Sequence, residues 1–276
     1  MLPELAPSAS GIPGLELTEL TGFALQFLFS MLRIGGFVLS APLFAARFIP
    51  LPVRIIISVM LAVPVVLTVP MPSPDSLSGM GAVPMVLSEL AIGLSAGVLM
   101  QVLFAAAIIA GDRIANTAGL GLAAQVDPST GSQSPVIGQF FLLFLLVIFV
   151  VEDGHLAAIG ILIESYRVIP AGGGLSPQAL TGTILESAGV MFSTSASLMM
   201  PVVAVLLLIN GVIGAITRSA PQLNIFAFGF PLTMTATIIL LFLTVPVIAS
   251  ALSDLVAHSL HTLFEMLEQA GPDGRR

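Results

Sequence analysis

Four charged side chains stand within or beside long apolar stretches of the sequence: Arg33, Glu89, Asp112 and Glu186. A charge that faces lipid is costly, so each of them should face protein or water. Acids gathered at one depth of several helices would indicate a proton or ion path. These residues are instead spread along the chain, which favours ion pairs between helices or between subunits and leaves the partner of each charge open.

Signatures of catalysis are missing from the sequence. It contains no HExxH, no intramembrane GxGD motif, no P-loop and no dinucleotide fingerprint. The absence of cysteine excludes disulfides, iron–sulfur ligation and thiol catalysis, and the three histidines are too scattered to predict a metal site. We therefore predict no enzymatic activity, no catalytic or metal-binding residue and no cofactor.

Composition indicates a polytopic integral membrane protein. Hydrophobic residues make up 57% of the 276 and charged residues 8%, with a mean hydropathy of +1.09, whereas soluble domains carry about 25% charged residues. The net charge of -7 and the lack of lysine argue against binding nucleic acid. Apolar runs of this length are too long for barrel strands, so the predicted fold class is all-α with about six long, kinked helices.

The predicted helices follow the apolar runs, with polar or proline-rich links between them. We expect one membrane-embedded domain over residues 1–276, with a polar N-terminal segment (1–20) and an amphipathic to polar tail (256–276). The expected segments are 23–44, 55–69, 83–110, 140–151 continued after a break by 156–168, about 179–217, and 225–255. The segment at 179–217 is too long for one simple span, and the segment after 225 is expected to break at Gly229 and Pro231.

A polar run between two apolar segments, from Gly119 to Gln139, is the most conspicuous feature of the sequence. Small residues at its start allow close backbone approach, and the following Asp-Pro-Ser-Thr-Gly sequence is typical of a rigid turn. Irregular backbone at membrane depth survives only where protein buries it or where it lines a watery cavity. The run therefore predicts a pore, a gate or an interface, formed by Gly119, Gly121, Ala123, Ala124, Asp127, Pro128 and Gly131.

A second polar stretch joins two apolar segments at RSAPQLNIFAFGFPLTM, residues 218–234. It combines a proline turn with Arg218, Gln222 and Asn224. Together with Arg33, Glu89 and Asp112, these three side chains are candidates for subunit contacts or for buried charge.

Five stretches in order resemble the FliR family of export-gate proteins, which includes the equivalent component of type III secretion injectisomes. They are APLFAARFIPLPVR (41–54), AGDRIANTAGLGLAAQVDP (110–128), DGHLAAIGILIESYRVIP (153–170), LMMPVVAVLLLINGVIGAI (198–216) and the stretch at 218–234. The resemblance covers almost the whole chain. The second and fifth stretches together are its most specific part.

The resemblance implies an all-helical subunit of the flagellar type III export gate in the bacterial inner membrane, in the flagellar basal body. In that family the gate is built with FliP and FliQ, FlhB surrounds its entrance, FlhA lies beneath, and unfolded flagellar proteins pass through its centre. The N-terminal part would be similar to a FliP-like unit and the C-terminal hairpin to a FliQ-like unit. The polar run would be the plug of the resting channel, although Leu122 and Gln125 replace aromatic residues common in the family.

Three alternatives remain open. Hydropathy and broken helices also suit a small-solute secondary transporter, and the family resemblance extends to injectisomes as well as flagella. An intramembrane enzyme is the least favoured alternative, because the sequence lacks a recognisable set of catalytic residues.

Overall fold

The computed structural model describes residues 17–46, 48–120, 136–220 and 225–272, and within these the regular secondary structure is all helix, with no strand. The N-terminal half holds α1 (Leu17–Ser40), α2 (Leu51–Thr68), α3 (Pro74–Ser78) and α4 (Ala82–Thr117). The C-terminal half holds α6 (Val136–Val151), α7 (Gly154–Val168), α8 (Pro177–Ser219) and α9 (Ile225–Ala270). The predicted all-α class is confirmed.

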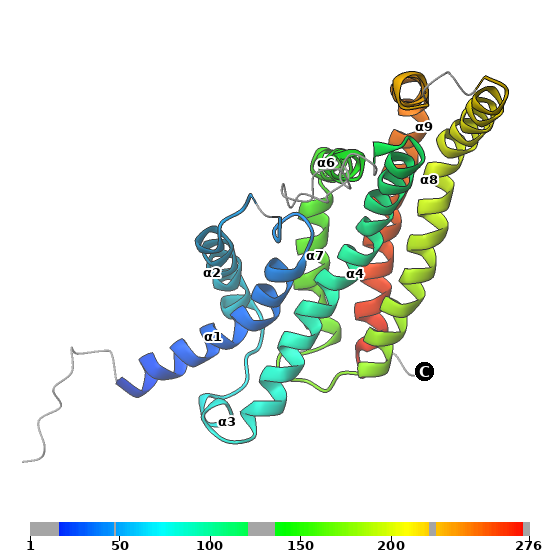
Figure 1. Cartoon of the computed structure of the whole chain (residues 1–276). Coiled ribbons are helices and arrows are strands. Elements are labelled where there is room, and N and C mark those ends of the chain that lie inside the picture. Colours follow the sequence, from blue (N-terminus) through cyan, green and yellow to red (C-terminus); the bar gives the residue numbers. More distant parts are fainter. Residues whose placement is uncertain (1–16, 47, 121–135, 221–224, 273–276) are drawn as a thin grey trace, which may run out of the picture.

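Helix α4 is the central element, and α1, α6, α8 and α9 pack around it (Figure 1). Its central turns are rich in alanine and leucine, and Leu99, Met100, Leu103 and Ala107 are fully buried. Small side chains let several helices approach one axis at once. The position of α4 therefore decides how the rest of the chain is arranged.

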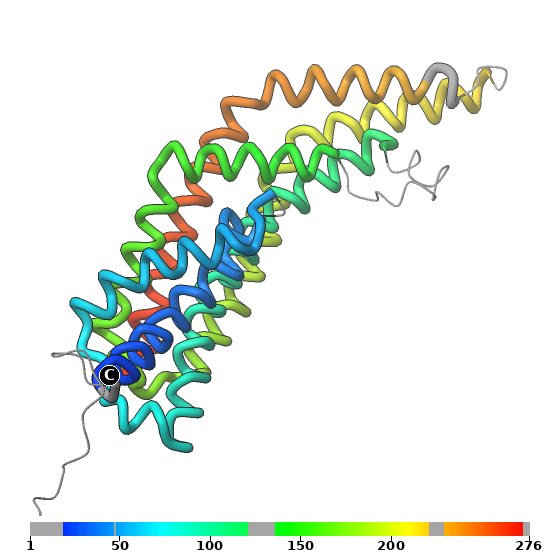
Figure 2. Tube along the Cα trace, turned by 90° about the vertical axis from the view of Figure 1, so that its left-hand side faces the viewer, coloured from blue at the N-terminus to red at the C-terminus, as the bar shows by residue number. Residues whose placement is uncertain are grey.

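A sharp elbow joins α6 to α7, whose axes differ in direction by 68° (Figure 2). The break falls at Glu152 and Asp153, and Asp153 has a left-handed φ of 56°. The expected continuation of the apolar segment after a break is thus confirmed. By length and composition, five of the described helices can cross a membrane, or six if this bent pair counts as one span.

One expectation about a helix break was wrong. No break occurs at Gly229 and Pro231, because α9 continues from Ile225 to Ala270 through Pro231 and Pro246. The segment expected at about 179–217 lies in α8, a helix of 43 residues that contains Pro201; it is longer than one simple span needs, as expected. A proline interrupts one helical hydrogen bond, but neighbouring helices and Ser or Thr side chains often compensate within a membrane. Both helices change direction along their length in Figure 2.

Candidate functional site: a buried charge cluster and the end of helix α4

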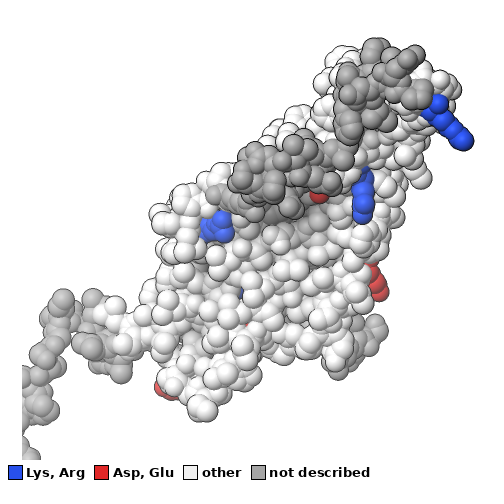
Figure 3. Space-filling view, viewed as in Figure 1, with Lys and Arg blue, Asp and Glu red and all other residues white. Residues whose placement is uncertain are grey.

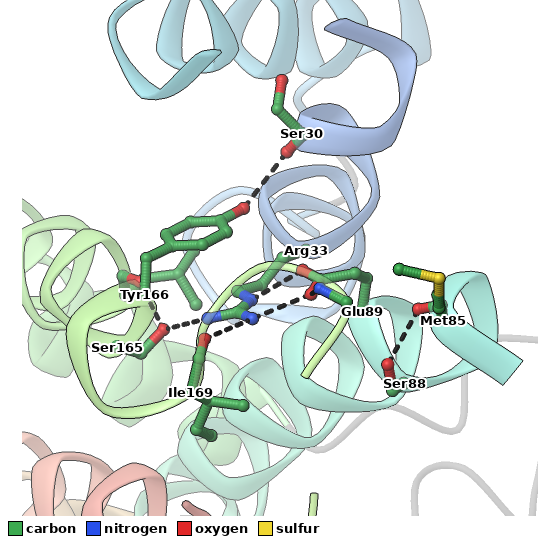
Figure 4. Close-up of polar contacts among 10 residues, drawn as sticks. Ser30, Arg33, Met85, Ser88, Glu89, Ser165, Tyr166 and Ile169 are labelled. Carbon is green, nitrogen blue, oxygen red and sulfur yellow. Dashed lines mark hydrogen bonds and ion pairs between the residues drawn. The ribbon is translucent and has the colours of Figure 1, made fainter. Parts of the chain in front are cut away.

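Among the described residues, the two most buried charges, Arg33 of α1 and Glu89 of α4, form an ion pair. The Arg33 Nε and Nη2 groups donate to the Glu89 oxygens Oε2 and Oε1 at 2.8 and 2.9 Å (Figure 4). Their side chains are 0% and 1% exposed. Two parallel bonds between a guanidinium and a carboxylate give a strong and strongly directional contact.

Further contacts of the pair come from the last turns of α7 and from the link that follows it. Arg33 Nη1 donates to Ser165 Oγ at 2.9 Å, and Nη2 donates to the Ile169 carbonyl at 3.0 Å. The Gly172 amide donates to Glu89 Oε1 at 2.9 Å. The ring of Tyr166 lies 3.9 Å from the guanidinium carbon, and its hydroxyl donates to the Ser30 carbonyl at 3.3 Å.

This cluster therefore joins three helices and a link. It connects α1 and α4 with α7 and the 169–172 turn directly after α7, through hydrogen bonds between residues at least 56 positions apart in sequence. A proton path needs access to water and a chain of further titratable groups. The buried pair is instead enclosed by its hydrogen-bond partners, so its geometry suits a fixed brace.

A close crossing of α1 and α4 brings the two charges together. A Cβ on Gly93 would overlap the Arg33 carbonyl, and one on Gly97 would meet the backbone of Ala41 at 2.6 Å. Glycines four residues apart on a membrane helix permit this backbone approach. The sequence reading missed this pair, although its Gly-xxx-Gly spacing was the signal.

Arg54, in the first stretch of the family resemblance, organises the connection between α1 and α2. Its guanidinium donates to the carbonyls of Ala45, Ala46 and Ile49 at 3.0–3.2 Å. One side chain thus donates hydrogen bonds to three backbone carbonyls in the turn that follows α1. Arg54, the last residue of the stretch at 41–54, therefore stabilises the turn between α1 and α2.

The C-terminal end of α4, where the conspicuous polar run begins, is held by the two helices of the C-terminal hairpin. Asn210 of α8 donates from Nδ2 to the Thr117 carbonyl at 3.0 Å. Thr233 of α9 shares its hydroxyl proton between the Ala118 carbonyl at 3.1 Å and its own helix's Phe230 carbonyl at 3.0 Å. Gly119 follows with a φ of +89°, and a Cβ placed there would lie 3.4 Å from the Phe230 ring.

The start of α6, where the polar run ends, is fixed on α4 as well. Gly138 packs on Gly111 so tightly that a Cβ on Gly111 would lie 2.6 Å from the Gly138 Cα. The Asp112 carboxylate lies against the same glycine, and its buried Oδ1 accepts no hydrogen bond from the described residues. The Asp112 side chain thus lies beside the first turn of α6.

Other predicted site residues lie apart from these clusters or outside the described part of the chain. Arg218 is exposed at the end of α8, and Glu186 is exposed on the same helix. The residues outside the described ranges are Gly121, Leu122, Ala123, Ala124, Gln125, Asp127, Pro128, Gly131, Gln222 and Asn224. No group of three or more acidic or histidine residues suited to a metal occurs among the described residues.

Comparison with known proteins decides the family. A family model described as bacterial export proteins, family 1, matches residues 24–259, from within α1 to within α9. The chain belongs to this family. The predicted resemblance is thereby confirmed over most of the chain, including all of the stretches on which it rested.

The chain is similar to curated proteins from several bacteria. The flagellar biosynthetic protein FliR of Bacillus subtilis is 31% identical over 248 residues, which cover 89% of this chain and 95% of that protein. The FliR of Pectobacterium carotovorum is 30% identical over 251 residues, 91% and 96% of the two chains. The secretion system apparatus protein SsaT of Salmonella typhimurium is 28% identical over 163 residues, 59% and 63% of the two chains.

Proposed function

We propose that this chain is a structural subunit of the flagellar type III protein export gate. With FliP and FliQ it forms the channel through which unfolded flagellar proteins cross the bacterial inner membrane, next to FlhB and FlhA. The observation that carries the proposal is the family match over residues 24–259, together with FliR relatives aligned over about nine-tenths of the chain. In this role the chain has no enzymatic activity and needs no cofactor.

The surface of the isolated subunit supports a place within an assembly in a membrane. Charged side chains are few and scattered on the face shown in Figure 3. Large apolar side chains are exposed along α8 and α9, among them Phe192, Leu208, Ile238, Phe242 and Leu243. Such faces require lipid or partner helices. We assign the α8–α9 hairpin the FliQ-like role and the preceding helices the FliP-like role.

The polar run after α4 is proposed as the plug of the resting channel. Its sequence is rich in small and turn-forming residues from Gly119 to Gly131. Support from the described residues comes from its two ends, which are both fixed: one by Asn210 and Thr233, the other by the packing of Gly138 on Gly111. A plug segment must be fixed at its ends if it is to return to the same closed position.

A small-solute secondary transporter is not favoured. The family and its relatives are export-apparatus proteins, and the paired charges of Arg33 and Glu89 are enclosed rather than arranged along a path. The equivalent subunit of an injectisome is the closer alternative, since SsaT is among the relatives. Coverage favours the flagellar branch, because the FliR alignments extend over far more of both chains.

Purification from membranes in mild detergent tests the proposal. Co-expressed with FliP and FliQ from the same bacterium, the tagged chain should elute in a large complex that contains all three. Expressed alone, it should aggregate or be degraded, because its apolar faces lack partners. A stable, monodisperse monomer that ignores FliP and FliQ would contradict the proposal and return the transporter to consideration.

The flagellar assignment needs a test in the cell. Deletion of the gene should abolish export of flagellar subunits and swimming, and a plasmid copy should restore both. Injectisome secretion measured in the same strains is the control. Loss of injectisome secretion with normal swimming would transfer the assignment to the injectisome.

A further inference from the structure

Two carbonyls at the end of α4 depend on other helices for their hydrogen bonds. The last four carbonyls of a helix have no partner within it. Gly119 donates its amide back to the Asn116 carbonyl at 3.1 Å, which closes part of the end. The carbonyls of Thr117 and Ala118 are completed instead by Asn210 and Thr233.

These two donors come from the two different helices of the C-terminal hairpin. Asn210 lies in the second half of α8, and Thr233 lies near the start of α9. In a membrane protein an unsatisfied carbonyl cannot turn to lipid for a donor. Withdrawal of the hairpin would therefore leave both carbonyls without their partners, and the hairpin and the end of α4 are coupled.

Gly119 adds a steric contact to the two hydrogen bonds. Its φ of +89° is a backbone conformation that favours glycine, and it lies against the Phe230 ring, one turn before Thr233. The direction in which the chain leaves α4 is thus set by α9 as well as by α4 itself.

We infer that Asn210 and Thr233 are positioning residues that let the α8–α9 hairpin set where the chain leaves α4 and enters the polar run. The inference deepens the proposed function and rests on it for one consequence, that displacement of this point affects sealing of the channel. The placement of Leu120, the last described residue before position 121, follows from the contacts alone.

Thr233→Val and Asn210→Leu remove the donors while roughly preserving side-chain size. Thr233→Ser retains a hydroxyl and should behave like the parent. Thr235→Val is the matched control, because Thr235 donates only to the Pro231 carbonyl of its own helix. Each variant is purified as the full complex, so that its assembly is measured first.

The first readout is the position of the α4 end. The chain has no cysteine, so a single one at Leu120 reports its own surroundings. In the complex, Asn210→Leu with Thr233→Val should change the rate of maleimide labelling at this cysteine severalfold, and Thr235→Val should leave it unchanged. An unchanged rate in the double variant, with normal assembly, overturns the inference.

The second readout separates the inference from the proposed plug. The double variant should admit a small dye into cells that contain normal amounts of complex, as should a deletion within the polar run. Leakage in the deletion alone would overturn the inference and leave the plug standing. A changed labelling rate without leakage in either strain would sustain the positioning role and reject the plug.

Discussion

Arg33 and Glu89 meet in a doubly hydrogen-bonded ion pair although 56 residues separate them and both lie in apolar helices. Ser165, Ile169 and Gly172 complete the polar shell. Removing one partner of a buried pair leaves an uncompensated charge, whereas replacing both can be nearly neutral. The two cases give different predictions.

Glu89→Ala should reduce the amount of assembled complex strongly, since loss of one partner commonly costs about 3–5 kcal/mol. The double variant Arg33→Met with Glu89→Met should assemble better than Glu89→Ala. Native gels of detergent-solubilised membranes measure both. Parental assembly and export in Glu89→Ala would show that the charge is not needed for the fold.

Gly93→Ala should also lower assembly, because its methyl group would overlap the Arg33 carbonyl and force α1 away from α4. Overpacking of this kind costs about 1–3 kcal/mol. Gly160→Ala is the matched control, since a Cβ there meets nothing within 4 Å. Thermal aggregation of the purified complex should distinguish the two, and equal midpoints would count against the close crossing.

Asp153 at the α6–α7 elbow allows a backbone test. Its φ of 56° disfavours branched side chains, so Asp153→Val should destabilise the complex by about 1–2 kcal/mol. Asp153→Gly should stay within a few tenths of a kcal/mol of the parent, because glycine adopts this conformation freely. The same thermal assay applies, and a Val variant as stable as the Gly variant would argue against a left-handed elbow.

The helices could be predicted from the sequence because helices that span a membrane appear in it as long apolar runs. The expected 83–110 segment lies within α4, and the break before Leu156 occurs at Glu152 and Asp153. The continuity of α9 through Pro231 could not be predicted, because a proline either ends a helix or only bends it, depending on what packs around it. The sequence therefore placed the spans better than their ends.

The pairing of the charges could not be predicted from the sequence for a related reason. Arg33 and Ser165 are 132 residues apart, and only the crossing of α1 over α4 together with the return of α7 brings them within 2.9 Å. Asn210 and Thr233 gave no local signal either, since their partners are carbonyls, which every residue carries. The Gly93–Gly97 spacing was a usable signal for the crossing.

Deletion of residues 121–124 tests the proposed plug directly. The anchors on either side, Ala118 on Thr233 and Gly138 on Gly111, remain in place, so the helices should still assemble. Without its stopper, the resting channel should leak ions and small dyes. If the run is only an interface spacer, the deletion would weaken assembly and produce no leak. Dye uptake in cells with verified complex levels decides between the two, and an impermeable membrane with normal assembly would rule out the plug.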